Sequence, residues 1–207
     1  MKHLIASAML AATVALGGLS AAADSAPVHL RGEVDSVNGS SFEVTPFGGA
    51  KAEVAWNNTT RFASLKAAQL SDITPGMFVG TAAIPQPDGT LKALEIHIFP
   101  ENLRGTGEGY RPFPQVAQGT MTNATVTNIA AASGASSDGG KTLTLTYKDG
   151  HQTVVVPKGI PIVLIGAADA SMLTPHAKVS VTAAKDAAGK LTATRLLIGL
   201  DGVTPPI

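Results

Sequence analysis

The sequence predicts an all-β protein made of two tandem small five-stranded barrels, OB-like and each with a short helix. Its 207 residues include 22 glycines and 13 prolines but only 14% charged residues, a composition typical of turn-rich β proteins. Apolar and polar residues alternate along much of the chain, with the period of a half-buried strand. A stretch of about thirty residues also recurs weakly at a fixed offset, which indicates that one supersecondary unit occurs twice.

The repeat sets the expected domain boundaries. Its matched residues are Ile73-Thr74-Pro75 with Leu173-Thr174-Pro175, Val79 with Val179, Gly89 with Gly189, Leu91 with Leu191, Ala93 with Ala193 and Ile98 with Ile198. We expect one barrel over residues 24–99, a second over 116–207, and a Gly/Pro-rich strap over 100–115 that packs against them.

Residues 1–23 are expected to form a secretory signal peptide. Lys2 supplies the positive start, Leu4–Leu19 is apolar, and Ala21-Ala22-Ala23 offers the small residues that precede a cleavage site. The apolar run is interrupted and is short for a membrane span of about 20 residues. Cleavage after Ala23 would leave no membrane span, and we expect a periplasmic or secreted bacterial protein.

Three strands and a helix are expected first in each half. In the first half, alternation predicts strands over Val28–Asp35, Phe42–Thr45 and Val54–Trp56, with Asn38-Gly39 as a hairpin turn. Ser64–Leu70 then reads as a short helix, because Ala and Leu replace β-branched residues.

Two more strands complete the unit. Thr74-Pro75-Gly76 forces a turn, and Phe78–Ile84 and Leu91–Phe99 form a hairpin around Asp88-Gly89. Three strands, a short helix and two strands is the element order of an OB-like barrel. An open meander or a small sandwich is the alternative.

The second half repeats this plan with two differences. One is a polar hairpin loop over Ser133–Gly140, and the other is an apolar stretch over Ile160–Ile165. Its expected strands lie around Ala124–Ile129, Leu143–Tyr147 and Val154–Val156, followed by a hairpin that turns at Ala188-Gly189.

The junction between the first half and the strap resembles a known family. The residues that carry the resemblance are Pro85-Gln86-Pro87-Asp88-Gly89-Thr90-Leu91, Ala93, Glu95, His97, Phe99-Pro100-Glu101 and Arg104-Gly105-Thr106-Gly107-Glu108-Gly109. They are similar to small exported bacterial proteins that carry domains of unknown function of the DUF5666 type. The resemblance implies a duplicated small β-barrel in the periplasm or envelope, without an established activity or functional residues.

Composition excludes several classes of function. Lysine plus arginine and aspartate plus glutamate both number 15, so the basic field of a nucleic-acid-binding protein is missing. The chain has no cysteine and therefore no thiolate metal site. It has no Gly-x-Ser-x-Gly nucleophile motif. We expect a non-enzymatic periplasmic binding or protein-interaction module, with an envelope protein or a small ligand as partner and no cofactor.

A divalent-metal protein is the alternative. Glu95 and His97 lie two residues apart on one strand face, opposite Leu94, Ile96 and Ile98, and could share a cation. Glu101 and Glu108 of the strap are the candidate further ligands. A solvated or packing pair is the simpler interpretation, because metal sites usually have three or four ligands. Arg195 and Leu197 occupy the matching places of the second half.

Four residues are candidates for ligand binding. Trp56, the single tryptophan, ends the third expected strand, where a core or rim position is the simpler interpretation. Arg104, Tyr110 and Arg111 come from the strap.

Overall fold

The computed structural model describes residues 26–132 and 140–207. The expected signal peptide, and residues 133–139 of the expected polar loop, lie outside these ranges. Among the described residues the regular elements are strands and one-turn 3-10 helices, so the all-β class is confirmed. None of the helices described is long and apolar enough to cross a membrane. The strands are β1 (Val28–Asn38), β2 (Ser41–Pro46), β3 (Ala52–Ala55), β4 (Arg61–Ala67), β5 (Phe78–Pro85), β6 (Leu91–Ile98), β7 (Gly109–Pro112), β8 (Thr120–Ala131), β9 (Lys141–Tyr147), β10 (Gly150–Val156), β11 (Ile162–Ala167), β12 (Lys178–Lys185) and β13 (Leu191–Gly199).

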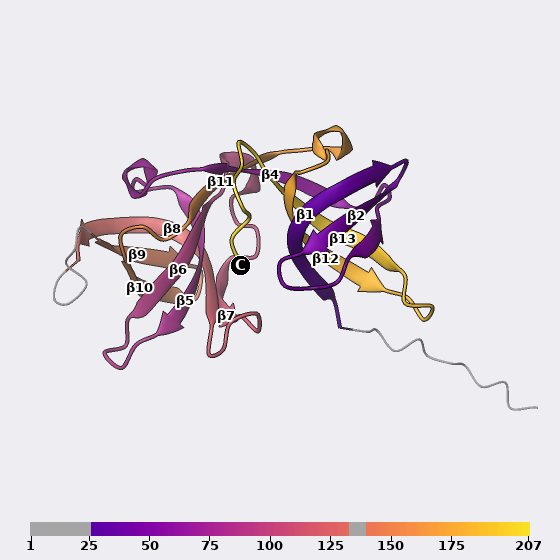
Figure 1. Cartoon of the computed structure of the whole chain (residues 1–207). Helices are drawn as coiled ribbons and strands as arrows, with labels where there is room; N and C mark the ends of the chain where they lie inside the picture. Colours follow the sequence, from indigo (N-terminus) through magenta and orange to yellow (C-terminus); the bar gives the residue numbers. More distant parts are fainter. Residues whose placement is uncertain (1–25, 133–139) are drawn as a thin grey trace, which may run out of the picture.

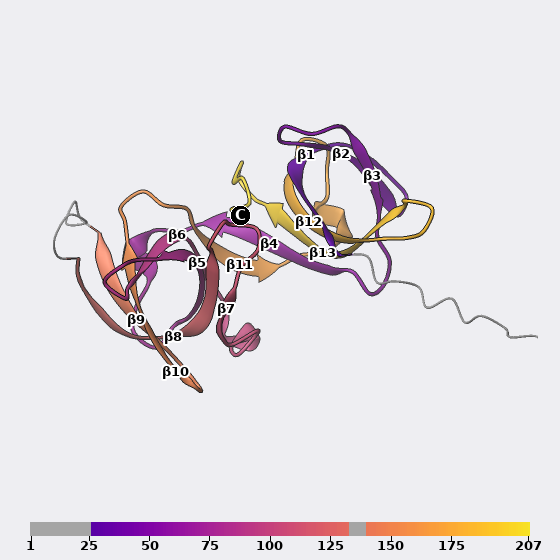
Figure 2. The ribbon, with the colours of Figure 1, turned by 90° about the horizontal axis from the view of Figure 1, so that it is seen from below.

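The strands pair into two closed circuits, seen as two lobes in Figure 1 and from below in Figure 2. In lobe 1, β1, β2 and β3 pair in order, β12 pairs β1, and β13 pairs both β12 and β3. These contacts close a five-stranded barrel. In lobe 2, β8, β9 and β10 pair in order, β5 pairs β8, and β6 pairs both β5 and β10. Lobe 2 thus repeats the pairing scheme of lobe 1.

The two halves of the chain exchange strands. Strands β1–β3 were expected to close a barrel with the hairpin of their own half, β5 and β6, but they pair instead with β12 and β13 from the second half. Strand β4 leaves lobe 1 for lobe 2, and β11 makes the opposite crossing (Figure 2). The hairpins β5–β6 and β12–β13 occupy equivalent places in the pairing schemes of the two lobes. The extended crossing strands direct each hairpin to the other lobe.

The prediction of a helix over Ser64–Leu70 is wrong. Most of this stretch is strand β4, which pairs antiparallel with β11 and parallel with β13. A single 3-10 turn, η1 (Leu70–Asp72), follows, and η4 (Ala170–Met172) is its counterpart in the second half. Strand partners on both sides of β4, together with the burial of Leu65, outweigh the helix propensity of the Ala and Leu residues.

Each lobe has its own apolar core. The core of lobe 2 contains Ile96 and Leu145, and the core of lobe 1 contains Phe42 and Leu196. A third, smaller cluster, with Leu65, Val163, Ile165 and Leu197, lies where β4 and β11 cross. The expected alternation therefore corresponds to core-facing and solvent-facing strand positions.

A β-bulge changes one expected face on β6. The β5–β6 register shifts between Ala82 and Ala83, which leaves Leu94 without a paired residue opposite it. Ala93 therefore faces the core together with Ile96, rather than sharing a face with Glu95 as the simple alternation predicted. Glu95 and His97, which follow the bulge, still share one face of the strand.

The strap is an ordered part of lobe 2. It begins with the 3-10 turn η2 (Glu101–Leu103), and β7 then pairs antiparallel with the edge of β8. Gly105 and Gly107 have positive φ and allow the tight turns between η2 and β7. The strap therefore brings Arg111 to the side of lobe 2 that faces lobe 1.

Candidate functional site: a basic cavity between the lobes

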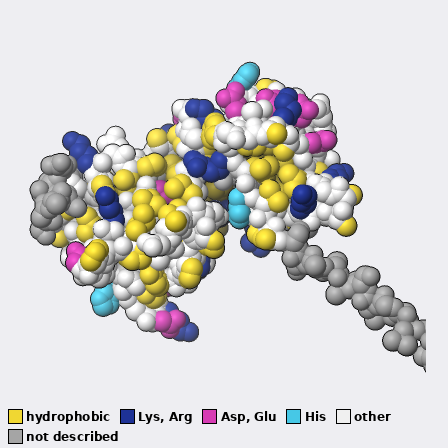
Figure 3. Space-filling view, turned by 60° about the horizontal axis from the view of Figure 1, so that its bottom comes forward, with side chains coloured by type: hydrophobic (Ala, Val, Ile, Leu, Met, Phe, Trp, Pro, Cys, Tyr) yellow, Lys and Arg dark blue, Asp and Glu magenta, His cyan; other side chains and the backbone are white. Residues whose placement is uncertain are grey.

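A cavity of about 420 Å³ lies where the two lobes face each other. Strands β1, β12 and β13 of lobe 1 form one wall, and β6, β7 and β8 on the side of lobe 2 form the other. Figure 3 shows the two lobes meeting at a notch with basic side chains and a histidine beside it. The cavity exists because the strand exchange places the two circuits side by side.

The charged side chains of this lining are all basic. Among the described residues that line the cavity there are three arginines and two histidines but no aspartate or glutamate: Arg31, Arg111, Arg195, His29 and His97. The rest of the wall is largely apolar, with Leu30, Phe47, Phe99, Phe113, Met121 and Leu197. The site therefore combines a positive potential with an apolar surface.

The three guanidinium groups differ in their partners. Arg31 donates from Nε and Nη2 to the Pro205 carbonyl oxygen, at 3.1 and 2.7 Å. Arg111 donates from Nη1 to the Gly107 carbonyl oxygen at 2.7 Å. Within the described ranges, Arg195 has neither a hydrogen bond nor an ion pair, and its side chain is exposed to solvent. Its donors are available to a ligand.

Arg195 also lies beside a second guanidinium. It pairs in register with Arg61 across the parallel strands β13 and β4. Desolvation and the Arg61 charge lower the pKa of Arg195, although an arginine remains protonated at neutral pH. The like charges raise the local positive potential at this end of the cavity.

His97 in the cavity wall and Glu95 behind it form a buried pair. Glu95 Oε1 lies 3.7 Å from His97 Nε2, and the two side chains are 2% and 12% exposed. Burial raises the pKa of Glu95 to about 7, against the opposing effects of the Ile207 hydrogen bond and Arg31. Burial, assisted by Arg195, lowers the pKa of His97 to about 4. The pair therefore carries less than a full charge near neutral pH.

The last described residues connect the lobes across the cavity. Arg31 of lobe 1 holds the Pro205 carbonyl, and the Ile207 backbone N–H donates to Glu95 Oε2 of lobe 2 at 2.6 Å. Pro205 and Pro206 are buried. Residues 203–207, which we call the tail clasp, therefore connect the two walls of the cavity.

The candidate metal ligands do not gather at one place. Glu95 and His97 come together, but Glu101 pairs with Arg104 at 2.6 Å and Glu108 accepts the Lys148 backbone N–H at 3.2 Å. No group of three or more His, Asp or Glu side chains suited to a metal ion occurs in the described part of the chain.

Of the four candidate ligand-binding residues, one lines the cavity, namely Arg111. Tyr110 is exposed on β7 next to it. Arg104 lies over the Phe78 ring at 5.9 Å and also donates to Glu101. Trp56 packs at the edge of the lobe 1 core, 6.0 Å from the Phe42 ring, which is the simpler position expected for it.

Sequence reasoning missed Arg31 and the role of Arg195. The two residues stand in different halves of the chain, and the strand exchange brings them to one cavity. One signal was available, because Arg195 occupies the place that Glu95 has in the first half. A charge reversal between matched positions of a repeat indicates that the two faces have different surroundings.

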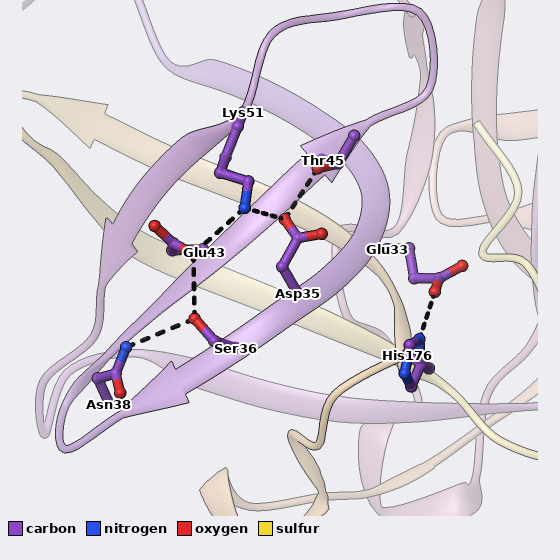
Figure 4. Close-up of polar contacts among 8 residues, drawn as sticks. All are labelled: Glu33, Asp35, Ser36, Asn38, Glu43, Thr45, Lys51 and His176. Atoms are coloured by element: carbon purple, nitrogen blue, oxygen red, sulfur yellow. Dashed lines mark hydrogen bonds and ion pairs between the residues drawn. The ribbon is translucent and has the colours of Figure 1, made fainter.

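A second polar cluster lies on the outer surface of lobe 1 (Figure 4). Lys51 Nζ lies 3.5 Å from Asp35 Oδ2 and 3.3 Å from Glu43 Oε2, and Glu33 pairs with His176 at 2.8 Å. The acids of this cluster are partly exposed to solvent. Each of them is satisfied by a neighbour within the cluster, so we assign the cluster no ligand.

One family model matches part of the chain. Residues 31–97 match the model of a family described as a domain of unknown function (DUF5666). The matched stretch runs from β1 to β6 and therefore contributes strands to both lobes. No curated protein and no solved structure matches the chain.

Proposed function

We propose that this protein, whose residues 31–97 match the DUF5666 family model, is a non-enzymatic binding module with the cavity between the lobes as its ligand site. The observation that carries the proposal is the lining, in which three arginines and an apolar wall face one space of about 420 Å³. Pockets for small molecules are concave, largely apolar, and span roughly 300–1,000 Å³. A small ligand fits this size better than a folded partner.

We also propose that each lobe is an OB-like barrel and that the protein is exported. Each lobe has three consecutive strands completed by a hairpin and closed by a parallel pair, which supports an OB-like barrel. The apolar start of the sequence supports export through a signal peptide over residues 1–23 and a periplasmic or secreted location.

The alternative of a metal-handling protein has weaker support. Two of its four candidate ligands, Glu101 and Glu108, already have partners in the strap and on Lys148. Glu95 already accepts a hydrogen bond from the tail clasp. A cation at Glu95 and His97 would have to compete with that bond and with the nearby arginines.

A variant that fills the cavity tests the proposal. Ser180 lines the cavity from β12, whereas Ala184 on the same strand is exposed outside it. Ser180→Trp should occupy the ligand space, and Ala184→Trp adds the same side chain elsewhere. We expect small molecules that raise the melting temperature of the full chain to do so for A184W but not for S180W, since a ligand stabilises the state it binds.

The readout is thermal unfolding of the three proteins against a panel of anionic, neutral and cationic small molecules. A ligand at 100 times its dissociation constant adds roughly 2.7 kcal/mol of stability, which such a scan resolves. The proposal fails if the panel stabilises S180W and A184W equally, or if no compound stabilises the wild-type protein.

A further inference from the structure

We propose that the inter-lobe cavity selects an amphipathic anion, that is, one small anionic head group on an apolar body. This inference rests on the proposed binding function and adds the class of ligand. It follows from how the charges of the lining are compensated, from the position of the apolar side chains, and from the size of the space.

The head group would bind at Arg195. This guanidinium lines the cavity, is exposed to solvent and makes no hydrogen bond or ion pair with any described residue. A guanidinium presents five N–H donors in a planar fork that matches a carboxylate or a phosphate. Arg195 can therefore hold an anion without giving up an existing contact.

The other two arginines add charge rather than free donors. Arg31 and Arg111 donate to the carbonyl oxygens of Pro205 and Gly107, which are neutral acceptors, so these hydrogen bonds leave the positive charges of both arginines in place. The carboxyl group of Glu95 is buried and accepts a hydrogen bond from the tail clasp. The charged side chains that line the cavity are all basic, so they attract an anion and repel a cation.

The body of the ligand would lie on the apolar wall. Phe99 and Met121 from the side of lobe 2 and Leu197 from lobe 1 face the same space as Arg195. An inorganic anion would leave this wall in contact with water, and a plain hydrocarbon would leave the guanidinium without a partner. A molecule with both parts satisfies both surfaces.

Four small probes separate these properties. Octanoate carries the anionic head and the apolar chain, octanol has the chain without charge, octylamine has the opposite charge, and acetate has the head alone. Isothermal titration of the full chain should give an affinity for octanoate at least tenfold above that for each of the others. The affinity should fall as salt is added, because ions screen charges in an open site.

Arg195→Gln provides the site-specific test. It should weaken octanoate at least about tenfold, the scale expected for loss of a hydrogen bond to a charged group. Lys92→Gln is the matched control, because it removes one positive charge from an exposed position on β6 outside the cavity. It should leave the octanoate affinity within twofold of wild type.

The outcomes distinguish the ligand class from the binding function. Octanol or octylamine binding as tightly as octanoate, yet blocked in S180W, would overturn the anionic class and keep the cavity as a binding site. Equal octanoate affinity in R195Q and K92Q would overturn the role of Arg195 as head-group site. If no probe shows binding that S180W abolishes, both the ligand class and the binding function are contradicted.

Discussion

At the scale of single residues, burial shifts the pKa values of Glu95 and His97 in opposite directions. Folded Glu95 keeps its proton up to about pH 7, whereas in the unfolded chain it loses it near 4.5. Between these values the folded state binds the extra proton, so this group stabilises the protein at low pH and the effect fades as pH rises to 7. Folded His97 loses its proton near 4 rather than 6.5, so its effect on stability increases as pH rises from 4 to 6.5. The two windows overlap, and the opposite slopes nearly cancel.

Single substitutions should therefore reveal each slope. In Glu95→Gln the Glu95 contribution, which falls with pH, is lost, so stability relative to wild type should rise from pH 4.5 to 7. In His97→Gln the His97 contribution, which rises with pH, is lost, so stability relative to wild type should fall from pH 4 to 6.5. Each change should be on the order of 3 kcal/mol. Urea unfolding at several pH values measures both, and flat difference curves for both variants would contradict the assigned pKa shifts.

At the scale of elements, the antiparallel pair of strands β4 and β11, which we call the β4–β11 ribbon, connects the two lobes. Leu65 on β4 pairs in register with Ile165 on β11, and these residues are also equivalent under the hundred-residue repeat. The pair therefore lies at the centre of the approximate two-fold relation between the halves. Leu65 is fully buried there, while Leu164, one residue away on β11, is 42% exposed.

Truncation of Leu65 should destabilise the whole molecule. Leu65→Ala leaves a cavity where the crossing strands pack, and we expect a loss of about 2–5 kcal/mol in the free energy of unfolding. Leu164→Ala removes the same atoms from an exposed position and should cost less than about 1 kcal/mol. If both variants lowered the free energy of unfolding equally in urea, the packing of Leu65 in the β4–β11 ribbon would be contradicted.

The ribbon also shows which elements could be predicted from sequence. Strands such as β1 and β2 follow from local alternation, and the Asn38-Gly39 turn follows from residues that accept positive φ. The strand character of Ser64–Ala67 does not, because it depends on partners that lie about one hundred residues away. Local propensity favoured a helix there, and tertiary pairing overrode it.

At the scale of the whole molecule, neither half can complete a lobe in this arrangement. Each half supplies three strands to one lobe and two to the other, so the cavity depends on both. The repeat predicted equivalent units. It carries no information on whether a hairpin pairs with the three strands of its own half or with those of the other half, since both arrangements use the same kinds of contact. Glu95 and His97 lie two residues apart on one strand, so the sequence could predict that they lie together. Arg31 and Arg195 stand in different halves, so the sequence could not predict that they share a cavity.

Cleavage of the strap should leave the halves together. A protease site inserted after Gly105, in a turn of the strap, would separate β1–β6 from β7–β13. We expect the two fragments to co-elute in size-exclusion chromatography under native conditions and to separate in denaturant. Fragments that part without denaturant, each with its own cooperative unfolding transition, would contradict the strand exchange.

The central claim is that the cavity between the lobes is the ligand site. A crystal structure of the full chain with octanoate tests it most directly, because it locates the bound molecule. We predict one octanoate between the lobes, its carboxylate within hydrogen-bond distance of the Arg195 guanidinium and its chain along Phe99 and Leu197. Octanoate bound only on the outer surface of a lobe, with the cavity holding solvent alone, would contradict the account.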